Sequence, residues 1–340
     1  MAKVVSVRPN VASLYYEETM RMKLSFLLLL TLLTISSQML AQEKVIMDTD
    51  IGDDIDDAYA VALALASPEL KILGITSAWG NTELRSQMLD RLLCLAGRSD
   101  VPVLSGVKTT TENVFSQQVW ARAGEGRVHG DAVDFLLDAI RKNPGEITLL
   151  AIAPLTNIGA AMDRDPVTFK KLKRIVMMGG SIRRGYGDTG LTPAHGPDAE
   201  YNIAMDVAAA RKLFQSGVPI YLMPLDSTQL ALDETKREML TTVSTPLTDA
   251  LLVLTAEWQR ASHQVTPVLY DVMAVAFAIK PELCPVTAMH ISVSEEGKTK
   301  EGPGTPNTNV CLASDAETFF QFLMPRLLKQ DLHGNSSCVR

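Results

Sequence analysis

The chain has 340 residues, of which 46% are hydrophobic and 21% are charged, a composition typical of a globular protein with a substantial core. Its formal net charge of −7 and isoelectric point near 5.3 argue against a scaffold that binds nucleic acid through a basic surface. The densest basic run, residues 170–174, precedes an expected strand and is expected to form a solvated helix end. We therefore predict no nucleic-acid partner.

A short apolar run near the N-terminus has the pattern of a secretory signal. Met22 and a lysine precede the apolar residues 24–35, and a polar, small-residue segment ends at Ala41. The run is short for a membrane span and fits a cleaved signal peptide, with an uncleaved anchor as the alternative. We expect residues 1–41 to be a signal peptide with an N-terminal extension, and Met20 or Met22 to be the true start. The mature protein is expected to be exported, periplasmic or secreted, without a stable membrane anchor.

Strand and helix patterns alternate from residue 44 onward. Strands are expected over residues 44–49, 70–77, 101–104, 147–152, 174–178, 219–223 and 286–293. Helices are expected over residues 56–66, 83–96, 131–141, 157–162, 207–215, 248–262, 271–279 and 315–329, and irregular loops over residues 179–196 and 297–309. This alternation is typical of βα units around a mainly parallel sheet. We predict a single α/β domain over residues 43–330, Rossmann-like with flanking helices, and a tail over residues 331–340.

The four cysteines lie far apart in the sequence, at Cys94, Cys284, Cys311 and Cys338. No Cys-x-x-Cys pair is present, so neither a zinc ribbon nor a redox pair is indicated. Export would permit disulfides, but the wide spacing and the large core make them unnecessary, and none is predicted. Cys94 lies in an apolar helical pattern and is expected to be buried.

The loop after the first expected strand is strongly acidic. Six carboxylates lie within ten residues: Asp48, Asp50, Asp53, Asp54, Asp56 and Asp57. Like charges at this density repel one another unless a cation lies among them, and oxygen-only ligands favour Ca²⁺ or Mg²⁺ over zinc. The alternative is a solvated loop with helix-capping aspartates. It does not explain why the charges follow a buried-type strand, where α/β sheets tend to hold ligands. The loop therefore predicts a metal site.

Polar residues also follow the later strands, where strand-end loops would gather them into one site. Each alone could be a helix cap or a turn residue. In chain order the motifs are Asp48-Thr49-Asp50-Ile51-Gly52 with Asp56-Asp57-Ala58, Gly80-Asn81, Pro154-Leu155-Thr156-Asn157-Ile158, Met177-Met178-Gly179-Gly180, Glu200-Tyr201-Asn202 and Asp271. This ordered set resembles the nucleoside hydrolase family, ribohydrolases that cleave the N-glycosidic bond of nucleosides with a tightly bound Ca²⁺. The resemblance runs from about residue 44 into the 280s.

The resemblance implies a role for each matching residue. Asp50, Asp57, Asp271 and the backbone carbonyl of Thr156 would ligate Ca²⁺, and Asp50 would also be the general base that takes a proton from the metal-bound water. The nucleoside would be bound by Asp56, Asn81, Met178, Glu200, Tyr201 and Asn202. Anionic neighbours stabilise the oxocarbenium-like state of glycosidic cleavage, and the flexible shell of Ca²⁺ can hold a sugar diol and water together. A homodimer or homotetramer is also implied.

The acidic motif departs from the family pattern in its length. Many members read Asp-Pro-Gly-x-Asp-Asp, whereas two further residues separate Gly52 from the pair in this chain. We align Asp56 and Asp57 to the family pair, and expect Asp53 and Asp54 to lie outside the ligand set.

A second departure lies where the leaving base would sit. Members that prefer pyrimidines or are nonspecific have a histidine before the last aspartate as a proton donor, and this chain has Tyr270, a weak acid with an ordinary pKa of about 10. The missing histidine favours purine nucleosides. His129 resembles a family position near the base and is a catalytic candidate with Tyr270. The family asparagine for the 5′-hydroxyl has no counterpart in residues 193–198. Further candidates near the base are His195, His263, Trp79, Trp120 and Trp258.

Two other functions share part of this pattern. A phosphohydrolase of the haloacid dehalogenase type also places an Asp-x-Asp after its first strand, with Mg²⁺, but that pattern leaves Asp56 and Asp57 unexplained. A secreted, non-catalytic riboside-binding protein could use Ca²⁺ to order a sugar-binding loop. The full set of motifs favours the Ca²⁺-dependent hydrolase over both.

Overall fold

The computed structural model describes residues 42–111, 113–124, 126–188 and 196–330, together with Met20, Leu332 and Cys338. The expected signal segment, apart from Met20, and the candidate His195 therefore lie outside the described residues. Within the described part of the chain, no helix combines the length and the apolar character that a bilayer crossing requires.

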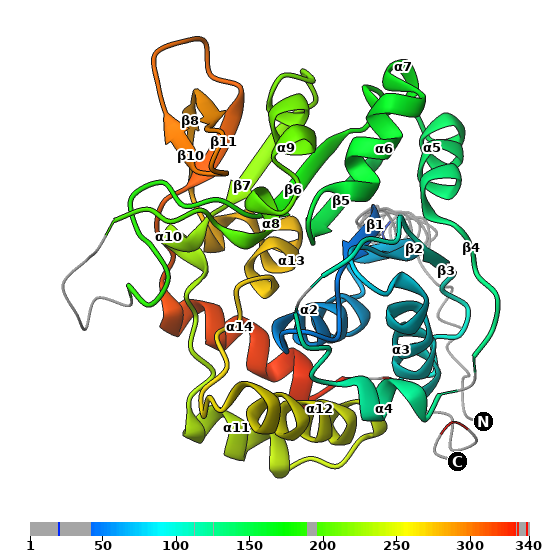
Figure 1. Cartoon of the computed structure of the whole chain (residues 1–340). Coiled ribbons are helices and arrows are strands. Elements are labelled where there is room, and N and C mark those ends of the chain that lie inside the picture. Colours follow the sequence, from blue (N-terminus) through cyan, green and yellow to red (C-terminus); the bar gives the residue numbers. More distant parts are fainter. Residues whose placement is uncertain are drawn as a thin grey trace, which may run out of the picture. The chain divides into compact units, whose positions relative to one another are not determined.

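Nine of the described strands form one twisted sheet, with β1 near its middle (Figure 1). Their order is β4-β3-β2-β1-β5-β6-β7-β11-β8, and all neighbours are parallel except β8 and β11. The strands are β1 (Glu43–Thr49), β2 (Leu70–Ser77), β3 (Val103–Ser105), β4 (Gly130–Asp131), β5 (Ile147–Ile152), β6 (Arg174–Met178), β7 (Ile220–Met223), β8 (Val286–Met289) and β11 (Thr308–Cys311). Every residue of β5 is buried, as expected for a parallel strand covered on both faces.

Helices cover both faces of this sheet and enclose two hydrophobic cores (Figure 1). One face carries α5 (Ala132–Lys142), α6 (Thr156–Arg164), α7 (Pro166–Phe169) and α9 (Val207–Phe214). The other face carries α2 (Asp56–Leu65), α3 (Thr82–Leu95), α4 (Gln118–Arg122), α12 (Pro246–Ser262), α13 (Val272–Ile279) and α14 (Ala316–Leu328). The short helices α8 (Tyr201–Ala204), α10 (Leu225–Thr228) and α11 (Glu234–Thr241) lie in the connections. The predicted α/β fold with a mainly parallel sheet is confirmed.

The strand order reverses beside β1, and this reversal determines where a ligand can bind. From β1 the chain builds outward through β2, β3 and β4 on one side, and β5, β6 and β7 extend from the other side of β1. Loops that leave β1 and β5 therefore turn in opposite directions and open a crevice at the carboxyl ends of these strands. The acidic loop begins at this crevice, directly after β1.

The C-terminal part of the sheet differs from the prediction. The single strand expected over residues 286–293 is two strands, β8 and β9 (Ile291–Val293), which are divided at His290 and belong to different sheets. The expected loop over residues 297–309 contains β10 (Thr299–Glu301), paired with β9, and the start of β11. The Gly- and Pro-rich sequence hid these strands, because each is only three or four residues long and leaves little local pattern.

The prediction that no disulfide forms is wrong. Cys284 pairs with Cys311 across 27 positions, and Cys94 pairs with Cys338 across 244 positions. Cys94 is half-buried rather than buried, which lets it reach the C-terminal segment. The fold brings these residues together, whereas their spacing in the sequence gave no sign of pairing.

We predict that replacing Cys284 and Cys311 together by serine lowers the free energy of unfolding by about 2–4 kcal/mol, since the unfolded chain loses a covalent loop constraint. Denaturant unfolding under oxidising conditions measures the difference. In reducing buffer the gap between wild type and variant should shrink. An equal midpoint for both proteins in oxidising buffer would contradict a stabilising bond.

Candidate active site

Two almost completely buried helices begin at the same place, at the carboxyl end of β1. Every residue of α2 is buried, and so are all but the last residue of α13, a pattern typical of helices enclosed by a core. Asp56 and Asp57 occupy the first turn of α2, and Asp271 lies at the N-cap position of α13. The N-terminal ends of helices carry partial positive charge, so both helices favour carboxylates at this point.

These three aspartates form a compact group. One carboxylate oxygen from each of Asp56, Asp57 and Asp271 lies within 4.8 Å of the others, and all three residues are buried. The hydroxyl of Thr49 donates a hydrogen bond to Asp57, and the backbone amide of Asp271 donates one to Asp56 over 3.1 Å. Among the described residues, no cationic side chain forms an ion pair with any of the three. The donor set is therefore oxygen-rich and lacks a positive partner.

The same burial determines the electrostatics of the group. Burial, followed by repulsion from the neighbouring carboxylates, raises the pKa of Asp56, Asp57 and Asp271 well above the ordinary value. Burial also raises the pKa of Asp50 to about 7, against the opposing effect of Arg85. The charge of Asp50 contributes to the raised pKa of Asp57 and Asp271. The ionised cluster therefore needs either protons or a cation, and its chemistry fits a hard divalent ion.

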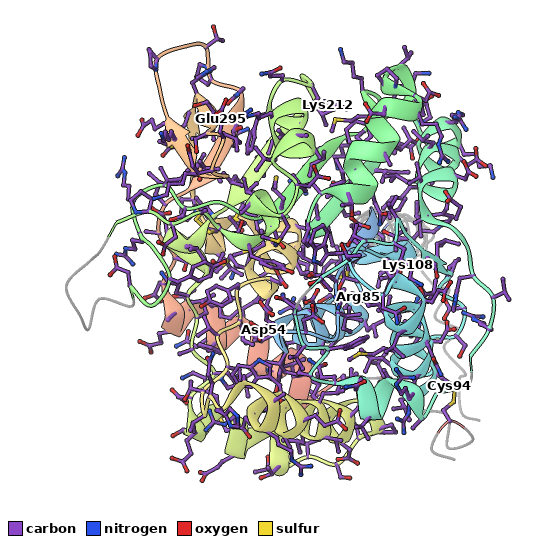
Figure 2. The ribbon with its side chains drawn as sticks, in the orientation of Figure 1. Asp54, Arg85, Cys94, Lys108, Lys212 and Glu295 are labelled. Atoms are coloured by element: carbon purple, nitrogen blue, oxygen red, sulfur yellow. A yellow bond between two sulfur atoms is a disulfide. The ribbon has the colours of Figure 1, made fainter. Side chains whose placement is uncertain are left out.

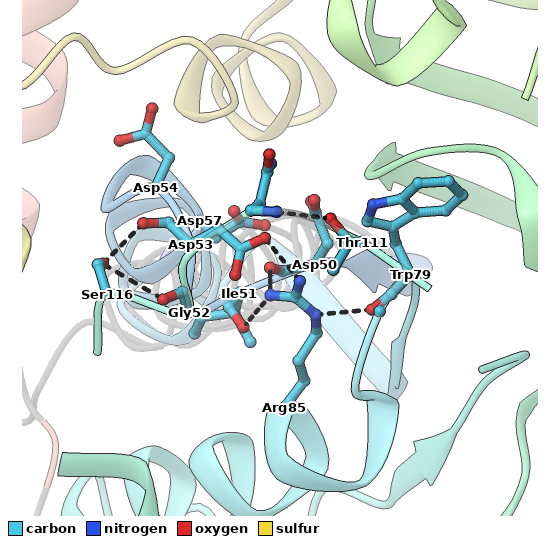
Figure 3. Close-up of polar contacts among 12 residues, drawn as sticks. Asp50, Ile51, Gly52, Asp53, Asp54, Asp57, Trp79, Arg85, Thr111 and Ser116 are labelled. Atoms are coloured by element: carbon cyan, nitrogen blue, oxygen red, sulfur yellow. Dashed lines mark hydrogen bonds and ion pairs between the residues drawn. The ribbon is translucent and has the colours of Figure 1, made fainter. Parts of the chain in front are cut away.

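The cluster lines a pocket of about 510 Å³, a volume typical of small-ligand sites. Asp50 lines this pocket too, although the compact group consists of Asp56, Asp57 and Asp271 rather than the expected Asp50, Asp57 and Asp271. Asp48 does not line it, because its carboxylate faces inward to Thr76 and Asn157. Asp53 and Asp54 also line the pocket, and Figure 3 shows Asp54 directed away from the other labelled carboxylates.

The predicted nucleoside-binding residues from the later strand ends reach the same pocket. Met178, Glu200, Tyr201 and Asn202 all line it. Glu200 caps α8, where its carboxylate accepts hydrogen bonds from the amides of Asn202 and Ile203. It also accepts one from the amide of Gly180 over 2.7 Å. Burial nevertheless raises the pKa of Glu200. A carboxylate held by three amides keeps a fixed direction towards a ligand.

Aromatic side chains form another part of the pocket wall. Tyr186, Tyr270 and Trp258 line it, and the rings of Tyr186 and Tyr270 meet edge to face with centroids 6.0 Å apart. Burial, followed by the charge of Asp56, raises the pKa of Tyr270 above its usual range. Tyr270 therefore keeps its proton and can donate a hydrogen bond, while it is a poor source of a transferred proton.

Three predicted site residues, Asn81, His129 and Thr156, do not line this pocket. Asn81 is exposed and caps α3, where its side chain accepts a hydrogen bond from the amide of Leu84 over 3.2 Å. His129 pairs with Asp90 over 2.7 Å and lines a different cavity, together with Asn81. The structure thus gives no support to the expected roles of Asn81 at the ribose and of His129 at the base, which stay predictions. Both residues serve the local structure around α3.

Thr156, His263 and two of the tryptophans are the other residues that the sequence suggested for this site. Thr156 opens α6 and is half-buried, and its hydroxyl is buried without a hydrogen-bond partner among the described atoms. The ligand role of its carbonyl stays a prediction. His263 is exposed at the end of α12, next to pocket-lining residues, and Trp120 is buried in the core. Trp79 does not line the pocket, which leaves Trp258 as the tryptophan beside the site.

Arg85 and Tyr186 belong to this site, and the sequence analysis missed both. Arg85 has 1% of its side chain exposed and reaches from α3 towards the acidic loop (Figures 2 and 3). It lies on the apolar face of α3 with Met88 and Leu92, so a charged residue in that stripe was a usable signal. Tyr186 comes from a loop whose sequence gives no comparable sign.

Comparison with known proteins identifies the family of this site. A family model described as inosine-uridine preferring nucleoside hydrolase matches residues 45–321. The chain belongs to the nucleoside hydrolase family. This membership confirms the resemblance drawn from the motifs, shows that the protein is an enzyme, and excludes the haloacid dehalogenase and non-catalytic alternatives.

Alignments of this nucleoside hydrolase with its relatives cover nearly the whole length of those proteins. The pyrimidine-specific ribonucleoside hydrolase RihA of Citrobacter koseri is 32% identical over 317 residues, which are 83% of this chain and 97% of that protein. A plant nucleoside hydrolase, PpNRh1, matches with a TM-score of 0.74 and 28% identity over 84% of this chain and 99% of its own. A purine-preferring ribonucleoside hydrolase from Gardnerella vaginalis matches with a TM-score of 0.71 and 26% identity over 84% of this chain and 98% of its own.

We predict that the stabilisation of this nucleoside hydrolase by added calcium grows as the pH rises from about 5 to about 8. The pKa of Asp50 is 3.8 ordinarily and about 7 in the fold, so between these values the folded protein holds protons that the unfolded chain has lost. The free energy of unfolding of the metal-free protein therefore loses a contribution as the pH rises, and calcium offsets that loss. Scanning calorimetry with and without calcium measures the shift in Tm. A shift that shrinks with pH would contradict this prediction.

Proposed function

We propose that this enzyme hydrolyses the N-glycosidic bond of ribonucleosides, with purine nucleosides favoured, to free base and ribose in a Ca²⁺-dependent reaction. The observation that carries the proposal is the group of three buried carboxylates within 4.8 Å, at a pocket of about 510 Å³. Three buried acids that form no ion pair with any described side chain are costly unless an ion joins them. A substrate with vicinal hydroxyls provides further oxygen ligands for such an ion.

Asp57 and Asp271 would hold the ion together with Asp50, and these three aspartates and Asp56 all line the pocket. When bound, Ca²⁺ supplies Lewis acidity and a flexible, oxygen-rich coordination shell. Calcium is favoured over magnesium because the carboxylates are many and Mg²⁺ demands a smaller, near-octahedral shell. The family is metal-dependent, in agreement with this acidic group.

Asp50 would accept the proton of the attacking water. Its carboxylate lines the pocket, and burial raises its pKa to about 7, a value suited to a general base near neutral pH. Asp56 would accept hydrogen bonds from ribose hydroxyls. Glu200 and Asn202, which line the same pocket, would bind the 5′ side of the sugar and stabilise the positive charge that develops on the ring.

The leaving base would contact the aromatic wall of Tyr186, Tyr270 and Trp258. A purine ring presents a large face for stacking and carries a basic ring nitrogen that can take a proton from solvent. Departure of a pyrimidine depends more strongly on a proton donor of the enzyme, and Tyr270 keeps its proton too firmly for that role. These properties support the preference for purines.

We also propose that the protein is exported. Both disulfides would be stable in an oxidising compartment such as the periplasm or the extracellular space, and the N-terminal apolar segment fits a secretory signal. A homodimer or homotetramer stays a prediction from the family resemblance.

The experiment that tests the proposal is a panel of purine and pyrimidine ribonucleosides, each assayed for free base and reducing sugar in the presence of calcium. We expect release of base and ribose together, faster for the purine members. A phosphate monoester and a 2′-deoxyribonucleoside serve as controls. Release of base from none of the ribonucleosides would contradict the function, and faster release from the pyrimidine members would contradict the preference.

A further inference from the structure

The buried side chain of Arg85 joins the backbone of the acidic loop to the backbone that follows β2 (Figure 3). Its guanidinium donates hydrogen bonds to the backbone carbonyls of Asp50 and Ile51, the latter over 2.9 Å. It also donates to the carbonyl of Trp79 over 2.8 Å, at the end of β2, and to the carboxylate of Asp53 over 2.8 Å. A planar group with five donors can satisfy such a set, and an ammonium group cannot.

The segment before α4 satisfies the next carbonyls along the acidic loop. The amide of Gln117 donates to the carbonyl of Gly52 over 3.1 Å, and the hydroxyl of Ser116 donates to that of Asp53 over 2.7 Å. The side-chain amide of Gln117 donates to the carbonyl of Asp54 over 2.7 Å. Together with the contacts of Arg85, the five successive carbonyls from Asp50 to Asp54 are all held from outside the loop.

Phe115 joins the two sets of contacts. Its ring lies 5.1 Å from the guanidinium carbon of Arg85 and covers Gly52. A Cβ atom at Gly52 would lie 1.6 Å from that ring, and the φ angle of +123° at Gly52 also disfavours any side chain there. The loop is thus packed against one ring and one cation.

These contacts matter because the acidic loop has little means of holding its own shape. Residues 50–57 contain no proline, and their carboxylates repel one another. Because outside donors hold the carbonyls, the backbone is fixed while the side chains of Asp50, Asp56 and Asp57 remain directed at the pocket. The pair of Arg85 and Asp53 adds no net charge, so it can fix the loop without competing with a bound cation.

We propose that Arg85, Asp53, Phe115, Ser116 and Gln117, here called the Arg85 clamp, position the carboxylate of Asp50 and preorganise the acidic loop before a cation binds. The inference rests on the proposed function where it concerns Asp50 as the proton acceptor. Arg85 is a positioning residue, because it touches the backbone of the loop rather than the pocket contents.

The test uses a charge-neutral double variant of the full-length protein, Arg85→Met with Asp53→Asn, which removes the Arg85 contacts of the clamp without changing the net charge of the protein. Arg91→Met is the matched control: Arg91 also lies on α3, stacks on Trp120 at 4.3 Å and donates to its carbonyl, away from the acidic loop. The three readouts are hydrogen exchange of the amides at 50–57 in calcium-free protein, the Kd for calcium alone by titration calorimetry, and kcat and KM for a ribonucleoside.

For the double variant we expect faster exchange in the loop, a Kd for calcium at least about tenfold weaker, and a kcat lower by about tenfold to 100-fold even at saturating calcium. The KM should change by less than about threefold, because Glu200 and Asn202, the proposed ligands of the sugar, are unchanged. Arg85→Lys should recover only part of the kcat, because lysine keeps the charge and loses the planar fork. Arg91→Met should match the wild type in all three readouts.

A double variant with a lower Tm but with wild-type kcat and calcium Kd at temperatures below unfolding would overturn the proposal, because Arg85 would then only support the fold. If the double variant does not fold, Arg85→Lys and Asp53→Asn decide in its place, and wild-type kcat and Kd in both would overturn it. Failure of the wild type to hydrolyse any nucleoside would refute the proposed function, and the exchange and calcium readouts would still decide on the clamp.

Discussion

Asp50→Asn should lower kcat by at least about 100-fold, the scale expected when a general base is lost. Asparagine keeps the shape of the side chain but cannot accept the proton of the attacking water. The backbone carbonyl of Asp50 would still be held by Arg85, so the loop should keep its conformation. The KM should change far less than kcat, because the proposed contacts of the sugar with Glu200 and Asn202 are unaffected.

The matched control for this substitution is Asp233→Asn. Asp233 is an exposed residue that caps α11 by accepting a hydrogen bond from the amide of Lys236 over 3.0 Å, and asparagine caps helices equally well. Steady-state kinetics at saturating calcium should give the wild-type kcat for this control. If Asp50→Asn also retained the wild-type kcat, Asp50 could not be the proton acceptor.

Asp57→Asn should act on calcium binding and on stability in opposite directions. The substitution removes one charged oxygen ligand, so the Kd for calcium should weaken by at least about tenfold. It also removes a like charge from a buried cluster, in which repulsion from Asp50 and Asp56 raises the pKa of Asp57. The calcium-free variant should therefore have a higher Tm than the calcium-free wild type near neutral pH.

Titration calorimetry and thermal unfolding of the same preparations measure the two effects of Asp57→Asn. A drop in activity should accompany the weaker Kd and should recover in part at high calcium. A calcium Kd equal to that of the wild type would show that Asp57 is not a ligand. A lower Tm in the absence of calcium would show that the carboxylate stabilises the fold by itself, against the electrostatic account.

Local sequence patterns predicted the central sheet well, because its strands are short apolar runs with clear ends. The strands at residues 70–77, 147–152 and 174–178 have the predicted bounds. The acidic loop was also visible, since its charge density is a local property. The alignment of the family pair to Asp56 and Asp57 agrees with the geometry, in which both lie in the compact group with Asp271.

The residues that the structure places differently from the prediction are those whose environment depends on distant parts of the chain. Asn81 follows a strand end as a ligand residue would, but the helix that starts after it takes its side chain as a cap. His129 lies in a promising motif, yet Asp90 on α3 holds it in another cavity. Both disulfides join residues whose proximity follows from the tertiary fold, so spacing alone could not reveal them.

Arg85 shows a signal that sequence reasoning can use in other chains. Its position on the buried face of α3 required a partner, and the acidic loop that lies earlier in the sequence provides one in Asp53 and in two backbone carbonyls. A cation in an apolar helical stripe, together with an unbalanced acidic loop, predicts that the two meet. Tyr186 carries no such signal, because a tyrosine in a loop gives no indication of what it contacts.

Calcium add-back to chelated enzyme tests the central claim most directly. Protein freed of metal by a chelator and then dialysed should release no base above background from a purine ribonucleoside. Addition of calcium alone should restore base release to the untreated rate, with half-maximal recovery at a calcium concentration equal to the Kd measured by titration calorimetry. Full activity in the metal-free enzyme, or recovery with a transition metal and none with calcium, would contradict a calcium-dependent hydrolase built on Asp50, Asp57 and Asp271.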